Sequence, residues 1–136
     1  MIELEKRIRV LLSKGDQDGH NVGIKYLATV LKNAGIEVIF TRYSIIDETA
    51  KTAREEDVDV ICLSFFGCGI IYDVSRLMNL LKEFQMEDVK VIVGGIISEE
   101  ESSKVLELGV SKVFIPGMSV EKLPELLQKW MLEKRG

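Results

Sequence analysis

The sequence has few of the residues from which small proteins build disulfide or zinc scaffolds. Its 136 residues include two cysteines, two prolines, one histidine and one tryptophan. Cys62 lies inside an apolar run, so we expect Cys62 and Cys68 to be reduced thiols rather than a disulfide. A structural zinc site needs about four Cys or His ligands and a catalytic one about three. A single histidine without a nearby cysteine pair fits neither kind of zinc site.

Excess positive charge and long apolar runs are also missing. The net charge of −4 argues against binding to a phosphate backbone, so nucleic acid is not an expected partner. No apolar run approaches the roughly 18 residues of a membrane span, and residues 1–6 carry acid where a signal peptide carries bases. We expect a cytoplasmic protein with no membrane partner. The length predicts one domain over residues 1–136, with its core at about 7–132.

The chain alternates apolar segments with segments of helical periodicity. This alternation predicts a parallel sheet with helices on both faces. We predict an α/β fold, a doubly wound five-stranded parallel sheet of the flavodoxin or Rossmann-like type with strand order 2-1-3-4-5. The expected strands are 8–12, 38–40, 58–64, 89–93 and 113–115, and the expected helices are 24–34, 50–56, 72–84, 100–108 and 120–132.

Glycine and polar residues follow four of the expected strands. They occupy residues 14–23, 64–69, 94–95 and 116–117. In doubly wound folds, ligands bind beyond the carboxyl ends of the strands, near the point where strands one and three diverge. We therefore expect these four segments to meet at one edge of the sheet and to form a ligand site.

His20 lies in the first of these segments. A lone loop histidine is most often simply solvated. However, a metal-bound imidazole usually donates its second ring N–H to a carboxylate, and Asp18 lies two residues away, with Lys14 available to anchor that carboxylate. A single protein ligand suits a metal that a macrocycle already holds. Haem is one such group, but its C-x-x-C-H attachment motif is absent from the sequence, and cobalt in a corrin explains more of the residues.

Three motifs at the expected strand ends resemble a known signature. Asp18-x-His20-x-x-Gly23, then Ser64-x-Phe66, then Gly94-Gly95 are similar to the D-x-H-x-x-G, S-x-L and G-G elements of cobalamin-binding domains. The resemblance implies that the cofactor binds base-off, with His20 replacing its dimethylbenzimidazole as the lower axial ligand of cobalt and Asp18 hydrogen-bonded to His20. Ser64 would contact the displaced nucleotide tail. The implied cofactor-binding residues are Lys14, Asp18, Gly19, His20, Gly23, Ser64, Phe66, Gly69, Gly94, Gly95 and Gly117, with His20 as the metal ligand.

The sequence departs from this signature at several positions. Phe66 stands where leucine is usual and Asn21 where a second aspartate is common, and Met118 replaces a usual threonine, which leaves a polar contact from position 118 open. Ordinary turn chemistry would by itself explain Gly69 or Gly117. The adjacent pair at 94 and 95 is more telling, because two glycines together leave the backbone open to a close approach.

Within the cobalamin-binding domains, residues 14–20, 56–61 and 93–97 most resemble methylmalonyl-CoA mutase and its relatives. That resemblance implies the small subunit of an adenosylcobalamin-dependent acyl-CoA mutase, an isomerase whose separate large barrel subunit binds acyl-CoA. A barrel takes about 250 residues, so this chain is not expected to be catalytic alone. We expect the loop residues Phe65, Phe66, Ile70 and Ile71 to lie by the corrin rim and to be covered by that partner, with core packing as the alternative.

Other functions stay open at this point. Residues 64–69 have something of the small subunit of glutamate mutase, although the short link after Gly95 favours the acyl-CoA type. A corrinoid methyl carrier of a methyltransferase system shows a similar motif, but normally with an extra helical domain. Receiver domains need an aspartate after strand three and a lysine after strand five, where this chain has Ser64 and Pro116. The usual glycine loops of nucleotide-binding modules do not occur in the sequence.

Overall fold

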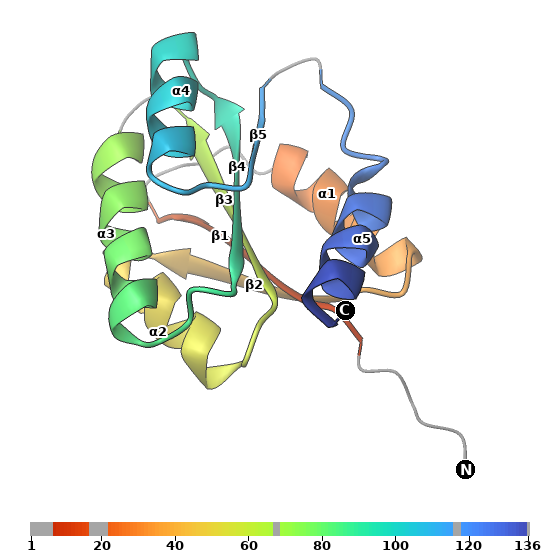
Figure 1. The fold of residues 1–136 in the computed structure, drawn as a ribbon. Coiled ribbons are helices and arrows are strands. Elements are labelled where there is room, and N and C mark those ends of the chain that lie inside the picture. The colour runs from red at the N-terminus through yellow and green to blue at the C-terminus, as the bar shows by residue number, and fades with distance from the viewer. Residues whose placement is uncertain (1–6, 17–21, 67–68, 116–117, 136) are drawn as a thin grey trace.

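The computed structural model describes residues 7–16, 22–66, 69–115 and 118–135. Five parallel strands form a single sheet in the order β2-β1-β3-β4-β5, and helices alternate with them (Figure 1). The predicted fold class and strand order are therefore confirmed. The elements are β1 Arg9–Gly15, α1 Val22–Asn33, β2 Glu37–Tyr43, α2 Asp47–Glu55, β3 Val60–Phe66, α3 Ile70–Glu83, β4 Lys90–Ile96, α4 Glu99–Glu107, β5 Lys112–Phe114 and α5 Leu123–Arg135.

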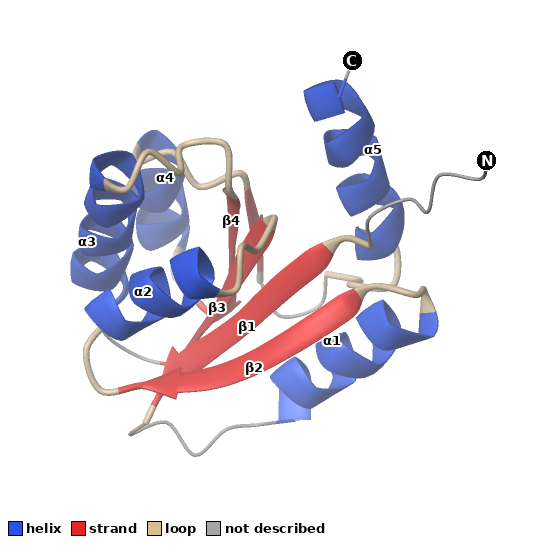
Figure 2. Cartoon of the chain, turned by 90° about the horizontal axis from the view of Figure 1, so that it is seen from below, coloured by secondary structure: helices blue, strands red, loops and turns tan. Residues whose placement is uncertain are grey.

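Helices cover both faces of the sheet. α1 and α5 lie on one face and α2, α3 and α4 on the other (Figure 2). Successive strand residues point to opposite faces, so β3 supplies both cores. Cys62 packs in the cluster under α1 and α5, whereas Ile61 and Leu63 pack in the larger cluster under the other three helices. This two-sided burial explains why the central strands are almost continuously apolar.

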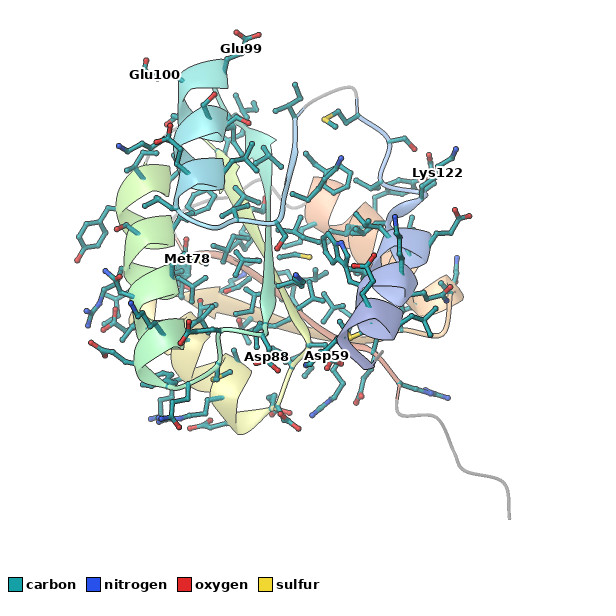
Figure 3. All side chains as sticks on the ribbon, viewed as in Figure 1. Asp59, Met78, Asp88, Glu99, Glu100 and Lys122 are labelled. Carbon is teal, nitrogen blue, oxygen red and sulfur yellow. The ribbon has the colours of Figure 1, made fainter. Side chains whose placement is uncertain are left out.

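Among the described charged residues Lys14 is fully buried, and the others are at least partly exposed. Glu99, Glu100 and Lys122 are exposed and point away from the sheet (Figure 3). Ser98 begins α4 with a capping box, in which its hydroxyl accepts the Glu101 N–H at 3.0 Å and the Glu101 carboxylate accepts the Ser98 N–H at 3.0 Å. No described helix combines the length and apolar character needed to cross a bilayer.

The strands run further at their carboxyl ends than their apolar segments predicted. β1 continues to Gly15, β3 to Phe66 and β4 to Ile96, so Gly94 and Gly95 lie within β4 and not after it. The predicted bounds were wrong because the ladder uses backbone groups, which polar residues and glycine also supply. α5 begins at Leu123 and not near 120, with Pro124 in its first turn, where a missing N–H costs nothing.

Candidate functional site

One row of residues crosses the sheet near its carboxyl edge. Lys14 pairs with Ser64, Ser64 with Gly94, and Gly94 with Phe114 in the parallel register. Side chains two positions apart on a strand point to the same face of the sheet. Cys62 lies two positions before Ser64 and packs in the cluster under α1 and α5, so this row faces the same two helices. The two smallest members are neighbours at the centre of the row. They leave a trough on the surface of the sheet.

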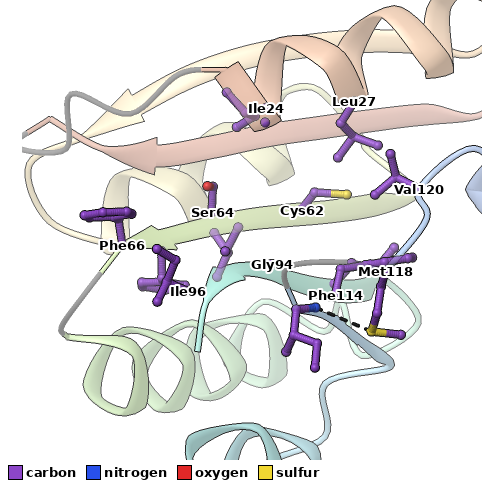
Figure 4. Close-up of a pocket in the computed structure, with 16 residues that line it drawn as sticks. Ile24, Leu27, Cys62, Ser64, Phe66, Gly94, Ile96, Phe114, Met118 and Val120 are labelled. Carbon is purple, nitrogen blue, oxygen red and sulfur yellow. Dashed lines mark hydrogen bonds between the residues drawn. The ribbon is translucent and has the colours of Figure 1, made fainter. Parts of the chain in front are cut away.

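A pocket of about 380 Å³ lies over this trough (Figure 4). Its walls include Ile24 and Leu27 of α1 on one side, and Met118 and Val120 from the segment before α5 on the other. Five of the predicted site residues line this pocket. They are Gly23, Ser64, Gly94, Gly95 and, at the rim, Phe66. The volume is at the lower end of the range for small-molecule sites. The pocket can therefore hold one compact group of a larger ligand.

The described side chains of the pocket are nearly all apolar. Among them Ser64 supplies the one hydroxyl, which is half-buried and makes no hydrogen bond with another described residue. Burial raises the pKa of the Cys62 thiol to about 12, so at neutral pH it is a neutral thiol and not a thiolate ligand. The Met118 sulfur accepts a hydrogen bond from the Ile115 N–H at 3.5 Å (Figure 4). Ser64 is thus the polar side chain that the pocket offers to a ligand.

The paired glycines have different reasons to be glycine. A Cβ on Gly94 would lie 3.5 Å from the Phe114 carbonyl oxygen, which is ordinary contact, so the fold itself does not require glycine there. Gly95 has a φ of +119°, and its Cβ would lie 1.9 Å from the Phe65 carbonyl oxygen. The fold explains Gly95 without any ligand. Gly94, by contrast, lines the pocket without a steric need for glycine from the fold.

Two other predicted glycines divide in the same way. Gly69 caps α3 with a φ of +84°, and it is not among the described residues of the pocket, so its backbone conformation explains it. Gly23 is the second residue of α1 and lines the pocket, and a Cβ there would meet nothing within 4 Å. A glycine in a helix costs up to about 1 kcal/mol relative to alanine. The fold therefore does not explain a glycine at position 23 either.

The remaining predicted residues vary in how the structure places them. Lys14 is fully buried on the same face of the sheet, but it does not line the pocket. Phe66 is 47% exposed at the rim. Phe65 and Ile70 are 5% and 3% exposed in the larger core cluster, and Ile71 packs against it. For these three residues the alternative of core packing holds, because Phe65 alternates with Phe66 and faces the opposite layer, and Ile70 and Ile71 begin α3 over that layer. Asp18, Gly19, His20 and Gly117 lie outside the described residues.

Side chains on both sides of the pocket are joined by hydrogen bonds. The Tyr26 hydroxyl of α1 donates to the Glu121 carboxylate at 2.6 Å, and the Ser119 hydroxyl donates to the same carboxylate. The hydrogen bonds from Ser119 and Tyr26 lower the pKa of Glu121, so the carboxylate is charged at neutral pH. The sequence did not predict this link, because the helical pattern places Tyr26 on an exposed face and gives no sign of a partner 95 residues away. The link holds α1 against the segment that forms the opposite wall.

The protein is thus a doubly wound α/β domain with an apolar pocket near the carboxyl ends of its strands. Residues 8–123 match the B12 binding domain family. This match covers far more than half of the chain, which therefore belongs to the B12-binding domain family and has cobalamin as its cofactor. The pocket is compatible with one compact group of this cofactor, because the Ser64 hydroxyl has no hydrogen-bond partner among the described residues and the fold does not require glycine at positions 23 and 94.

Similar proteins include two small subunits. The chain is 40% identical over 119 residues to the pivalyl-CoA mutase small subunit of Xanthobacter autotrophicus, covering 87% of this chain and 80% of that one. It is 36% identical over 109 residues to the 2-hydroxyisobutanoyl-CoA mutase small subunit of Aquincola tertiaricarbonis, covering 79% and 80%. Methylmalonyl-CoA mutase of Escherichia coli is 33% identical over 113 residues, which are 82% of this chain and 16% of that protein.

Solved structures with the same fold include a cobalamin-binding protein and response regulators. A cobalamin-binding protein from Desulfitobacterium hafniense superposes with a TM-score of 0.75 at 20% identity, covering 92% of this chain and 59% of that one. A two-component response regulator from Clostridium difficile superposes with a TM-score of 0.71 at 16% identity, covering 96% and 100%. At these identities both show the fold alone. The fold therefore does not separate cobalamin binding from signalling, and the match to the B12 binding domain family does.

Replacement of Gly23 by alanine should change stability and cofactor binding in opposite directions. We expect Gly23→Ala to raise the free energy of unfolding by up to about 1 kcal/mol, because alanine favours the helix. Its Cβ should at the same time weaken cobalamin binding, because it occupies space beside the pocket. Urea denaturation and cofactor titration measure the two effects.

Gly35 provides the matched control for this variant. Gly35 follows α1 with a φ of +82° and does not appear among the described pocket residues, so Gly35→Ala should lower stability and leave affinity unchanged. A Gly23→Ala protein that binds cobalamin as tightly as the wild type would contradict the role given to Gly23.

Proposed function

We propose that this chain is the small subunit of an adenosylcobalamin-dependent acyl-CoA mutase, an isomerase in which a separate large barrel subunit binds the acyl-CoA. The observation that carries this proposal is its similarity to two mutase small subunits over 80% of their lengths. Bound adenosylcobalamin supplies a cobalt–carbon bond that breaks homolytically. The chain itself binds and presents the cofactor and is not catalytic alone.

His20 serves as the lower axial ligand of cobalt in this proposal, with the cofactor base-off. Asp18 accepts the second N–H of the imidazole and so fixes its tautomer. The pocket supports this arrangement, because a base displaced from cobalt needs a site of its own, and Gly23, three residues after His20, lines such a site. Gly117 and Gly19 flank the cofactor in the same proposal, and Lys14 anchors the Asp18 carboxylate.

The pocket residues hold the displaced nucleotide tail. Ser64 donates or accepts a hydrogen bond at the floor, while Gly94 lets the tail approach the backbone of β4. The apolar side chains of Ile24 and Leu27 exclude water from that contact. Each of these residues binds or orients the tail and takes no part in bond breaking.

Apolar side chains at the rim supply the surface for the large subunit. Phe66 and Ile96 are 47% and 55% exposed beside the pocket, and Ile115 and Met118 are 40% and 43% exposed across from them. Exposed apolar groups that lie together mark interaction sites. They surround the site where the cofactor would emerge, so a partner bound there would enclose it.

Reconstitution tests the proposed function directly. The purified chain should bind adenosylcobalamin and convert no substrate by itself. Addition of a large mutase subunit from the same organism should then produce isomerisation of a branched acyl-CoA, followed by chromatography of the CoA esters. A panel that includes pivalyl-CoA, 2-hydroxyisobutanoyl-CoA and methylmalonyl-CoA identifies the substrate. Methyl transfer from the bound cofactor, without isomerisation of any ester, would support a corrinoid methyl carrier instead.

A further inference from the structure

The residue that follows β1 is held by the end of the neighbouring strand. The carboxyl ends of β1 and β2 lie side by side (Figure 2), with Gly15 opposite Tyr43. The Asp16 N–H donates to the Tyr43 carbonyl at 2.9 Å, one step beyond that pair. The Ser44 hydroxyl donates to the Asp16 carboxylate at 2.7 Å. Both the backbone and the side chain of Asp16 are therefore bound to the end of β2 and the residue after it.

The two residues that hold Asp16 are themselves fixed by the helices. The Glu48 carboxylate, in the first turn of α2, accepts the Ser44 N–H at 2.7 Å and the next N–H along the chain at 3.1 Å. The Tyr43 side chain is buried, and its hydroxyl donates to the Asp73 carboxylate, in the first turn of α3, at 2.9 Å. The hydrogen bonds that hold Asp16 therefore extend to α2 and α3.

This anchor lies at the start of the segment that carries the proposed metal ligand. Residues 17–21 separate Asp16 from α1, and they include Asp18 and His20. At the other end of this segment, α1 is held at Tyr26 by its hydrogen bond to the segment before α5. A binding group that is held close to its bound position loses less conformational entropy when the ligand binds. Fixed ends on both sides of His20 should therefore favour coordination of cobalt.

We propose that Asp16 and Ser44 are positioning residues for axial ligation, because their hydrogen bond holds the start of the segment from which His20 reaches cobalt. This inference rests on the proposed function, since it takes His20 as the axial ligand. Without the bond, only a fraction of the molecules holds the start of the segment in the position that permits coordination. The apparent affinity for cobalamin falls in proportion to that fraction.

Two substitutions at position 44 test the proposal on the full chain. A single hydrogen bond shifts such an equilibrium by a small factor, so Ser44→Ala should bind cobalamin roughly three- to tenfold less tightly in equilibrium dialysis. A smaller fraction of its bound Co(II) should show a histidine nitrogen in electron paramagnetic resonance, which a loss of stability alone does not change. Ser44→Thr keeps the hydroxyl and should restore both values. Thr29→Ala removes an exposed hydroxyl that bonds within α1 and should alter neither.

A double variant tests whether the two residues act through one bond. Asp16→Ala should weaken binding about as much as Ser44→Ala, because either change removes the same hydrogen bond. The double variant Asp16→Ala/Ser44→Ala should then bind about as well as the weaker of the two single variants. A loss equal to the product of the two single losses would show that the residues act separately, and the proposed pairing would be wrong.

The outcomes separate this inference from the function on which it rests. Unchanged affinity and an unchanged nitrogen signal in Ser44→Ala overturn the positioning role while leaving axial ligation intact. A loss that Ser44→Thr does not restore also overturns it, because the hydroxyl is then not the group responsible. Absence of a histidine nitrogen signal from the wild-type protein overturns axial ligation by His20 and this inference together.

Discussion

The His20→Ala variant is expected to lose nitrogen coordination of cobalt by the protein and most of its cobalamin affinity. Loss of an outer-shell partner of a metal ligand typically costs roughly 10- to 100-fold in affinity, so loss of the ligand itself should cost more. His20 is the one histidine of the sequence, which makes the assignment unusually direct. Incorporation of 15N-histidine into the untagged chain labels a single imidazole.

Electron paramagnetic resonance of the Co(II) form measures this coordination. The nitrogen splitting should change when 15N-histidine replaces 14N-histidine, because the coordinating nitrogen then belongs to the protein. Asp18→Asn should retain the splitting and reduce affinity by roughly 10- to 100-fold, since it weakens the outer-shell hydrogen bond. Axial ligation by His20 would be ruled out if the nitrogen splitting were the same with 14N-histidine and 15N-histidine. It would also be ruled out if the His20→Ala protein bound cobalamin with unchanged affinity.

The sequence predicted the topology and the floor of the pocket better than its walls. Strand order follows from the alternation of apolar and helical segments, since right-handed crossovers leave few arrangements. Ser64 and Gly94 were found because polar and glycine residues follow the expected apolar strands and match motifs of cobalamin-binding domains. Ile24 and Leu27 have the same helical spacing as core residues, so their position at the cavity depends on where α1 begins relative to the sheet, which the spacing does not specify.

Two pairs of adjacent residues have different surroundings that the sequence pattern could not predict. Phe65 and Phe66 look equivalent in the sequence, yet one is buried under α2, α3 and α4 and the other is exposed at the pocket rim. The strand period assigns them to opposite faces only once the register of β3 is known. Gly94 and Gly95 likewise look like one motif. The close approach of the Phe65 carbonyl to Gly95 is a tertiary contact that no local pattern contains.

Alanine at positions 94 and 95 should therefore impair the protein in two different ways. Gly94→Ala is expected to leave the free energy of unfolding within about 1 kcal/mol of the wild type, because its φ is not positive and its Cβ makes ordinary contacts. The added methyl faces the pocket, and overpacking of about 1–3 kcal/mol would weaken cobalamin binding by roughly 5- to 150-fold.

Gly95→Ala should instead lower the free energy of unfolding by more than about 3 kcal/mol, since a positive φ and an overlap with backbone must both be relieved. Urea denaturation and equilibrium dialysis on both variants measure the two effects. A stable Gly94→Ala protein with full affinity would mean that the tail does not approach β4. A Gly95→Ala protein as stable as the wild type would mean that β4 can shift away from Phe65 and that the fold does not require glycine at position 95.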